Sequence, residues 1–335
     1  MSEFHIRVVQ LGPITKHPNA DTLSITHVGG DGGYPVILRT GEYQEGARAV
    51  YVPVGAAVPA SDPRWAFLVK PGSTKPYVEI DAKRLRGVFS MGLLTAADPA
   101  WEVGRDVREA LGIVRAEDVA GDSDRALGNG YNEADPGLMP CYTDIEGLRA
   151  HSRVLQASEE VVITEKVHGE NARYCVGNGR LYCGSRTRWK NPESENGWTA
   201  TGVELGLQGK LEALGGSVGI YGELYGNVTG MRYDATAAKR GLCLFDAMHI
   251  NSRTYLDYDA FVDVAQALGI HTAPVLYRGP WHDGLRALAD GASTINPQHV
   301  REGIVIRPVR ERVAHMGRVI LKLHGERYLL KQWKV

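Results

Sequence analysis

Short runs of alternating hydrophobic and polar residues dominate the first hundred positions. They fall at 5–12, 22–30, 34–41, 48–55 and 77–96, and Gly, Pro and Asp separate them. A period of two is typical of strands with one buried face, and such closely spaced turn signals are typical of a small barrel or sandwich. The length fits a five-stranded OB-type barrel. Periodicity alone does not separate this fold from an SH3-like barrel.

The pattern changes near residue 101. Residues 101–114 predict a helix, and residues 116–140 then carry acids, Gly, Asn and Pro with little apolar patterning. Between Glu102 and Glu146 there are 11 acidic residues against 4 Lys or Arg. We therefore predict that residues 106–148 form a linker or helical excursion.

Strands and helices are mixed in the remainder of the chain. Strands are predicted at 159–176, 179–186, 217–226, 241–250, 301–309 and 317–330, and helices at 202–215 and 258–269. Because the strands outnumber the helices and do not alternate regularly with them, we expect antiparallel sheets with packed helices, not a doubly wound parallel fold. The predicted class is α+β with two domains, a β-barrel at 1–105 and a larger domain at 149–335.

Composition supports two globular domains. The chain has 335 residues, of which 43% are hydrophobic, and its 38 basic and 39 acidic residues give a net charge of −1. This average argues against a generally basic nucleic-acid binder. Local charge differs, since residues 171–192 carry five basic residues and no acid, and residues 301–335 carry nine against three acids. Such stretches suit a groove for phosphates, with solvated hairpin faces as the alternative.

Several common classes are not indicated. No apolar run approaches the ~18 residues that a bilayer span needs, and charges stand where a signal peptide would be apolar. The four cysteines lack CxxC spacing and suit reduced thiols. We expect a cytoplasmic protein with no membrane partner.

The sharpest local motif lies at 164–171, where a strand runs into a tight polar turn. A lysine at a strand end beside a Gly turn, as Lys166 is beside Gly169, is held rigidly and can direct its amine into a cleft as a nucleophile. The amine must first lose a proton, which burial or a nearby cation favours. Taken alone, such a lysine is more often a surface charge.

Further motifs follow Lys166 in a fixed order along predicted strands. Together they offer one nucleophile, one arginine, two carboxylates, one aromatic ring and a terminal lysine, which are the groups that nucleotidyl transfer needs. After the lysine they are Arg186, Glu223, Phe245, Glu302, Lys322 and His324.

This ordered series resembles the covalent nucleotidyltransferase superfamily of ATP-dependent ligases and capping enzymes. The KxHGxN form, with His where DNA ligases usually have Asp, is most similar to the RNA ligases. The resemblance implies that Lys166 attacks the α-phosphate of ATP, expels pyrophosphate and becomes lysyl-AMP.

The resemblance also implies roles around the nucleotide. Glu165 would help to read the adenine, or else be an exposed strand carboxylate. Phe245 would stack on the adenine face, or else be a core residue. Asn171 would hold a phosphate of the nucleotide or of the 5′ end, or serve only as a turn residue. Arg186 would contact the ribose or a phosphate.

Two carboxylates and two basic residues complete the implied site. Glu223 would bind the ribose hydroxyls or the waters of a metal ion, and Glu302 the metal shell or the phosphates. Both are costly to bury without a partner. Lys322 would neutralise the α-phosphate in the transition state. His324 stands where the family's KxK pattern has a second lysine, which leaves its role open.

Domain order selects a branch of the superfamily. DNA ligases and capping enzymes place an OB module after these motifs, whereas only the 13 residues 323–335 follow Lys322 here. The chain therefore resembles RNA ligases with an N-terminal OB domain and a C-terminal adenylyltransferase domain, the Deinococcus-type RNA-repair ligases.

Three arginines are candidate RNA contacts. Arg84 and Arg86 lie beside an aromatic residue in a β segment, as expected of a surface that tracks a phosphate backbone, although an amphipathic strand explains them equally well. The string 17–23 resembles tRNA-binding OB modules, or is an Asn/Asp turn. Arg149 would meet the phosphate end, or be a surface residue.

The resulting hypothesis is an ATP-dependent RNA ligase of the RNA-repair type. It would join a 3′-OH to a 5′-phosphate at nicks in duplexes with RNA on the 3′-OH strand, as a monomer, with Mg²⁺ or Mn²⁺. Lysyl-AMP and 5′-adenylated RNA would be its intermediates. The alternatives are a ligase for DNA or pre-adenylated ends and, in another class, a non-catalytic OB-containing RNA-binding protein. A capping guanylyltransferase is disfavoured by the domain order.

Overall fold

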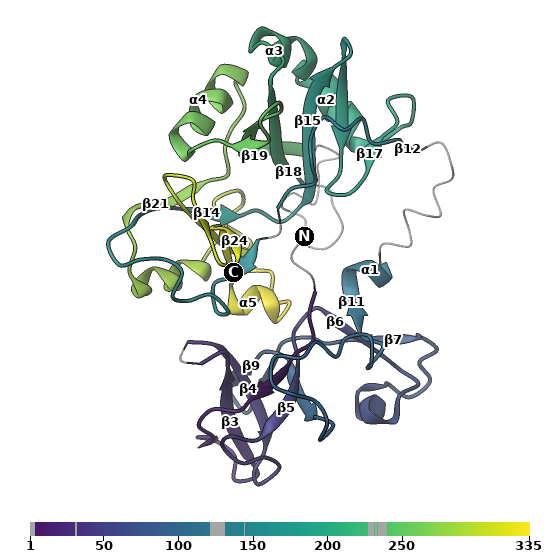
Figure 1. The fold of residues 1–335 in the computed structure, drawn as a ribbon, viewed down its shortest axis with the longest axis vertical. Helices are drawn as coiled ribbons and strands as arrows, with labels where there is room; N and C mark the ends of the chain where they lie inside the picture. Colours follow the sequence, from purple (N-terminus) through teal and green to yellow (C-terminus); the bar gives the residue numbers. More distant parts are fainter. Residues whose placement is uncertain are drawn as a thin grey trace. The chain divides into compact units, whose positions relative to one another are not determined.

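The computed structural model describes residues 4–30, 32–120, 131–143, 145–226, 231, 233 and 240–335. The chain forms two compact units, Met1–Ala126 with Arg149–Ser152, and Leu127–Leu148 with Arg153–Val335 (Figure 1). The segment predicted as a linker, 106–148, is thus divided between the units, and its stretch 121–130 lies outside the described residues. Each unit is described by itself below.

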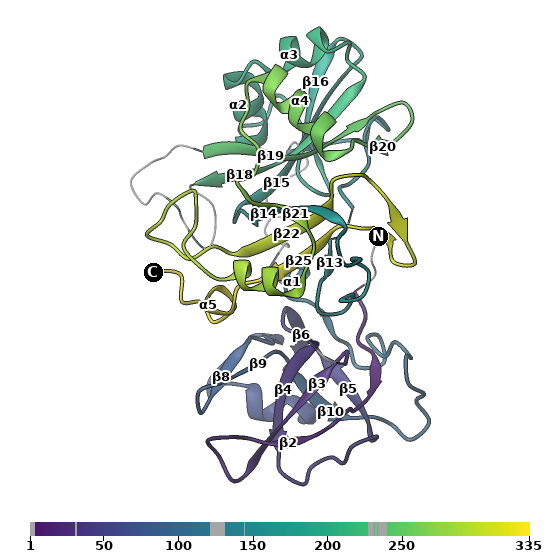
Figure 2. The same ribbon diagram turned by 90° about the vertical axis from the view of Figure 1, so that its left-hand side faces the viewer.

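The first unit is the predicted β-rich module (Figure 2). Its strands form three small sheets and a separate hairpin. The hydrophobic positions of the alternating strands, with Trp65 of the short 3-10 helix Pro63–Leu68, fill its core. The sheets are β1 (Val8–Gln10), β5 (Arg48–Val52) and β10 (Leu93–Ala96); β2 (Thr15–Lys16), β3 (Leu23–Val28) and β4 (Tyr34–Arg39); and β11 (Val114–Arg115), β6 (Ala56–Pro59) and β7 (Tyr77–Glu79). The hairpin is β8 (Lys83–Leu85) and β9 (Val88–Ser90).

The helix predicted over 101–114 is wrong. The segment consists of turns, and Gly104 and Gly112 adopt positive φ values of 90° and 61° that a helix does not allow. Val107 and Leu111 share one helical turn, since the Leu111 N–H donates to the Val107 carbonyl at 3.0 Å. The turn ends at Gly112, and both side chains lie in the core of the unit. A short helix, α1 (Ala116–Ala120), begins only after β11.

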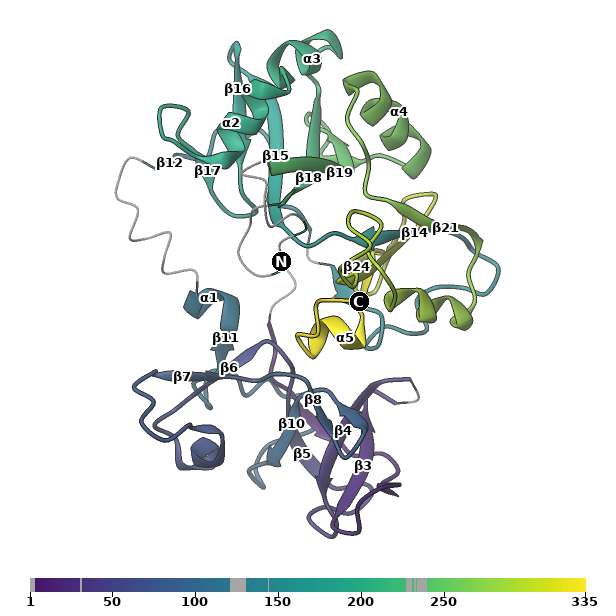
Figure 3. The same cartoon turned by 180° about the vertical axis from the view of Figure 1, so that it is seen from behind.

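The second unit contains a seven-stranded antiparallel sheet covered by helices on one face (Figures 1 and 3). Its order is β12 (Asn132–Glu133), β17 (Trp189–Lys190), β16 (Arg180–Gly184), β15 (Glu170–Gly177), β18 (Val218–Gly226), β19 (Arg240–His249) and β20 (Thr254–Tyr255). The helices are α2 (Gly197–Glu204), α3 (Leu207–Ala213) and α4 (Tyr258–Leu268). The single helix predicted at 202–215 is interrupted, because Gly206 is left-handed at φ 62°.

A five-stranded sheet completes this unit. Its order is β13 (Glu146–Gly147), β25 (Leu321–His324), β22 (Gly303–Pro308), β14 (Glu160–Lys166) and β21 (Val275–Pro280), and only the β13–β25 pair is parallel. One face packs on the 3-10 helix Asp283–Ala289. The hairpin β23 (Val313–Ala314) and β24 (Gly317–Arg318) and the helix α5 (Glu326–Leu329) flank it.

The two sheets meet through their other faces. Val305 of the five-stranded sheet and the nearby Ile320 pack with Tyr221 and Met248 of the seven-stranded sheet. These antiparallel sheets with packed helices confirm the predicted α+β class. Within the described ranges, no helix is long and apolar enough to span a bilayer.

Candidate active site

Strand pairing gathers three of the predicted residues on one face of the five-stranded sheet. Lys166 lies opposite Gly303 of β22, which in turn lies opposite His324 of β25. Val305 similarly lies opposite Lys322. Directly opposed residues share a face, and so do residues two apart in a strand. The nucleophile candidate, Lys322 and His324 therefore face the same side, although about 160 residues separate the first from the others.

The seven-stranded sheet contributes Asn171 and Glu223, which are directly opposed on β15 and β18. Both lie on the face that the helices leave uncovered. The turn before Asn171 is tight, since a Cβ placed on Gly169 would lie 2.2 Å from the Leu224 carbonyl oxygen and 2.8 Å from Glu223 Cγ. Only glycine allows this approach, which explains the Gly of the KxHG string.

Glu302 is the centre of the cluster. Lys166 Nζ donates to its Oε1 at 2.6 Å, His324 Nε2 lies 3.5 Å from Oε1, and His168 Nδ1 lies 3.5 Å from Oε2. Burial alone would raise the pKa of Glu302, but Lys166 and the two histidines hold it well below its usual value. Burial lowers the pKa of His324. At neutral pH the cluster therefore holds an ionised Glu302 and a neutral His324.

His168 and Tyr328 were given no role from the sequence. The Met231 N–H donates to His168 Nε2 at 3.1 Å, so the proton of the neutral ring lies on Nδ1. That nitrogen lies 2.9 Å from the Tyr328 hydroxyl, on α5, and faces Glu302. The histidine of KxHG was a signal for this contact, whereas nothing in the sequence marked Tyr328.

Two oxygen-bearing side chains of the site, Glu223 and Asn171, have their burial only partly offset by protein partners. Burial, with the charge of Glu302 added, raises the pKa of Glu223 to about 8, and Lys166 offsets this only in part. Asn171 Oδ1 is buried without a hydrogen-bond partner among the described residues. A buried carboxyl and a buried amide oxygen in this state are suited to a cation or a donor from a ligand.

Phe245 lies at a β-bulge of β19, where the pairing with β18 shifts between Tyr221 and Gly222. A bulge redirects a side chain. The half-buried ring meets Tyr142 edge-on, with the ring centroids 4.8 Å apart. Tyr142 donates its hydroxyl to Asp246 Oδ2 at 2.7 Å, so a residue from the predicted linker supports the ring.

Asp246 is fully buried between two arginines, Arg318 at 2.6 Å and Arg307 at 3.0 Å. Burial would raise its pKa, but these guanidinium groups hold it below its usual value. The ion pairs join β19 to β22 and β24. They therefore tie the strand of Phe245 to the sheet of Lys166.

Two predicted residues are not joined to the Glu302 cluster by the contacts described above. Glu165 is buried on the opposite side of β14, where Ser293 and Thr294 bind its carboxylate. Arg186 is half-buried in the turn between β16 and β17.

The candidate RNA contacts lie in the first unit. Arg84 and Arg86 are exposed on the β8–β9 hairpin. The string 17–23 holds this hairpin, because His17 Nε2 donates to the Leu85 carbonyl at 3.1 Å and Asn19 Nδ2 to the Arg86 carbonyl at 3.0 Å. Arg149 is half-buried and donates to the Gly33 carbonyl at 3.4 Å.

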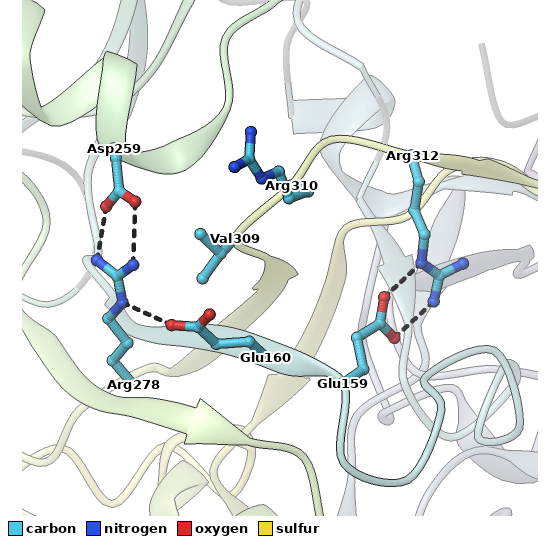
Figure 4. Close-up of a pocket in the computed structure, with 7 residues that line it drawn as sticks. All are labelled: Glu159, Glu160, Asp259, Arg278, Val309, Arg310 and Arg312. Atoms are coloured by element: carbon cyan, nitrogen blue, oxygen red, sulfur yellow. Dashed lines mark hydrogen bonds and ion pairs between the residues drawn. The ribbon is translucent and has the colours of Figure 1, made fainter.

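A separate pocket of about 270 Å³ lies at the other end of β14 (Figure 4). Its charges are paired, since Arg278 joins Asp259 to Glu160 and Arg312 binds Glu159. Six residues of strand, ~20 Å, separate Glu160 from Lys166. The pocket therefore does not belong to the lysine cluster.

A β-barrel unit, followed along the chain by a two-sheet unit in which a carboxylate holds a strand-end lysine, has the features of a two-domain nucleotidyltransferase. Residues 159–324 match the family model of RNA ligases, and residues 5–97 match a model of an OB-fold domain. The chain therefore combines a domain of the RNA ligase family with an OB-fold domain. The OB-fold match confirms the predicted N-terminal barrel and excludes the SH3-like alternative.

Solved structures of the Naegleria gruberi RNA ligase are similar to the whole chain. The complex with PPi has a TM-score of 0.79 and 22% sequence identity, and covers 98% of this chain and 97% of that one. A variant solved with ATP and Mn has a TM-score of 0.78 and 20% identity, over 98% and 99%. At this identity the likeness shows the fold. Comparison with the sequences of curated proteins gives no significant match.

Proposed function

We propose that this protein is an ATP-dependent RNA ligase that acts as a monomer and seals 3′-OH/5′-phosphate nicks in duplexes with RNA on the 3′-OH strand. The observation that carries the proposal is the 2.6 Å contact between Lys166 Nζ and Glu302, on a face shared with Lys322. Similar structures of Naegleria gruberi RNA ligase variants contain ATP with Mn or AMP with Mn, which supports the same ligands here.

Lys166 is the proposed nucleophile. The ammonium first gives a proton to solvent. The neutral nitrogen then forms a bond to the α-phosphorus of ATP while the bond to pyrophosphate breaks, and the second proton released from the nitrogen passes to solvent or to the departing pyrophosphate. Glu302 orients the amine before attack. Lys322, two residues before His324 on the same face, offsets charge on the α-phosphate, since phosphoryl transfer depends mainly on positioning and electrostatics. The neutral His324 places an N–H beside the Glu302 carboxylate.

A divalent cation fits the residues present. Glu223, Glu302 and Asn171 offer oxygen atoms, which Mg²⁺ and Mn²⁺ prefer, and the positive charge of Lys166 offsets the burial of Glu223 only in part. No group of three or more His, Cys, Asp or Glu residues in the described ranges could hold a metal ion alone. We therefore infer that Glu223 and Glu302 act through water or beside the phosphates of ATP. When bound, the cation offsets phosphate charge.

In the second step AMP passes from Lys166 to the RNA 5′-phosphate, and in the third the 3′-OH attacks this adenylated end and AMP leaves. Phe245 is proposed to stack on the adenine, and Asn171 and Arg186 to hold phosphate or ribose. Arg84, Arg86 and Arg149 are proposed RNA contacts, and the His17 and Asn19 bonds to the β8–β9 hairpin support the first two.

The primary test uses ATP labelled at the α-phosphate. The wild-type protein with Mn²⁺ or Mg²⁺ is expected to become labelled, and Lys166→Ala is not. Lys75→Ala, an exposed lysine of the first unit, is the matched control and should label normally. An unlabelled wild type, or label that survives Lys166→Ala, contradicts the proposed mechanism. An unlabelled wild type leaves a non-catalytic RNA-binding protein or a ligase for pre-adenylated ends, which differ in whether they seal pre-adenylated nicks.

Substrate choice needs a second measurement. Nicked duplexes with RNA or DNA on the 3′-OH side are offered to the wild-type protein, and faster sealing of the RNA nick is expected. Equal rates would refute the RNA preference. Pre-adenylated nicks test the alternative specialisation, since an enzyme restricted to them would seal them without ever becoming labelled.

A further inference from the structure

Glu165 precedes the nucleophile directly, yet its side chain lies on the other side of the strand. Neighbouring residues in a strand point to opposite faces. Lys166 reaches Glu302, whereas Glu165 is only 1% exposed. A buried carboxylate needs hydrogen-bond donors, so the question is what supplies them.

Both donors come from one distant segment. Ser293 Oγ donates to Glu165 Oε1 at 2.5 Å, and the Thr294 N–H donates to Oε2 at 2.7 Å. Ser293 is itself 2% exposed, and its hydroxyl accepts the Ile295 N–H at 3.1 Å. Both carboxylate oxygens are thus occupied, and the hydroxyl that binds one of them is fixed in turn.

The same segment also reaches the other side of the nucleophile. Asn296 Nδ2 donates to the Tyr233 carbonyl, and the Tyr233 hydroxyl accepts the His168 N–H at 2.9 Å. Val167 packs in one hydrophobic cluster with Tyr233 and Ile295. Residues 293–296 therefore hold the chain both before and after Lys166.

We propose that Glu165 and Ser293 are positioning residues that fix the backbone of Lys166 so that its amine stays against Glu302. The Glu165 carboxylate does not read the adenine. An adenine amino group would have to reach a buried carboxylate and displace one of two charge-assisted hydrogen bonds. This inference rests on the proposed role of Lys166 as the nucleophile.

The test measures the rate of lysine adenylylation against ATP concentration, with inosine triphosphate, which lacks the amino group, as the competitor. Ser293→Ala and Glu165→Gln are both expected to lower the rate at saturating ATP by about tenfold or more. The KM for ATP and the preference for ATP over inosine triphosphate should stay unchanged. Ser293→Thr, which keeps the hydroxyl, should restore the rate.

If Glu165 instead recognised the adenine, its substitution would change the KM for ATP and not the rate at saturating ATP. Glu165→Gln would then raise the KM for ATP and weaken the preference for ATP, while Ser293→Ala would behave as wild type. That result overturns the inference, and so does a Ser293→Ala rate equal to that of Ser252→Ala, an exposed serine of the same unit.

Hydrogen exchange separates this inference from the proposed function. Amides of residues 164–168 should exchange faster in Ser293→Ala and in Glu165→Gln than in the wild type or Ser252→Ala, whether or not the protein is labelled by ATP. Unchanged exchange refutes the proposal that Glu165 and Ser293 fix the backbone of Lys166. An unlabelled wild type with faster exchange in the variants refutes the proposed function alone. If Ser293→Ala does not fold, Glu165→Gln with Ser293→Thr gives the same comparison.

Discussion

Replacing Gly169 by alanine should separate folding from catalysis. The residue lies in the turn between β14 and β15, three positions after the proposed nucleophile. An added Cβ would stand 2.2 Å from the Leu224 carbonyl oxygen and 2.8 Å from Glu223 Cγ. The first contact is with backbone of a central strand, which has little freedom to move.

The size of the effect follows from these distances. Ordinary contact of a methyl group with an oxygen or carbon is ~3.5 Å, so the turn or Glu223 must shift by about 1 Å. Overpacking of this kind costs about 1–3 kcal/mol of folding stability. A misplacement of about 1 Å at a reacting site costs about 100-fold in rate. We therefore expect a folded protein with lysine adenylylation slowed about 100-fold.

The assay combines the α-labelled ATP reaction with urea unfolding. Gly209→Ala is the matched control, because its Cβ would meet no atom within 4 Å and it lies inside α3. That change should leave the rate unaltered and stabilise the helix by about 0.5–1 kcal/mol. A Gly169→Ala protein that labels within threefold of the wild-type rate would refute the reasoning.

Three further outcomes are expected. Asp246→Asn leaves two buried arginines without their shared carboxylate, so urea unfolding should give a free energy of unfolding lower by about 3–5 kcal/mol. The control Asp283→Asn changes an exposed residue and should alter this free energy by less than about 1 kcal/mol. Because the pKa of Glu223 is raised to about 8, the folded chain holds this proton more tightly than the unfolded chain, so stability is lost as the pH rises from the ordinary carboxyl range toward 8. Without a divalent cation, Glu223→Gln should therefore gain thermal stability relative to wild type across that range, and parallel pH profiles would contradict the assignment. His17→Ala should weaken RNA binding in a filter assay while labelling by ATP is kept, and unchanged RNA affinity would exclude the β8–β9 hairpin as a contact.

The order of the motifs was readable from the sequence because each motif lies in or beside a predicted strand. Lys166, Glu223, Glu302 and Lys322 each lie next to or within a short apolar run, so their secondary structure could be predicted locally. That these strands pair with one another then follows from the expected antiparallel sheets. What no local pattern contains is the register, which places Gly303 between Lys166 and His324.

The contacts that sequence reasoning missed come from segments without a chemical motif. Tyr328 lies on a four-residue helix, and Tyr142 lies in the acidic stretch predicted as a linker. Each is placed by tertiary packing alone. The helix predicted at 101–114 is wrong for a related reason. Val107 and Leu111 share a single helical turn whose side chains lie in the core, and Gly112, with its positive φ, does not continue it.

The alternation of side chains between the two faces of β14 continues through residues 165–168, so neighbouring residues there contact different parts of the unit. Lys166 and His168, two residues apart, both face Glu302, while Glu165 and Val167 point into the packed side. A strand can therefore offer its odd and even positions to different tasks. Lys166 and His168 contact the Glu302 carboxylate on one side, and on the other side Glu165 and Val167 are the residues proposed to fix the backbone of the proposed nucleophile. This division predicts that substitutions on the packed side change the rate at saturating ATP, whereas those that touch the nucleotide also change its affinity.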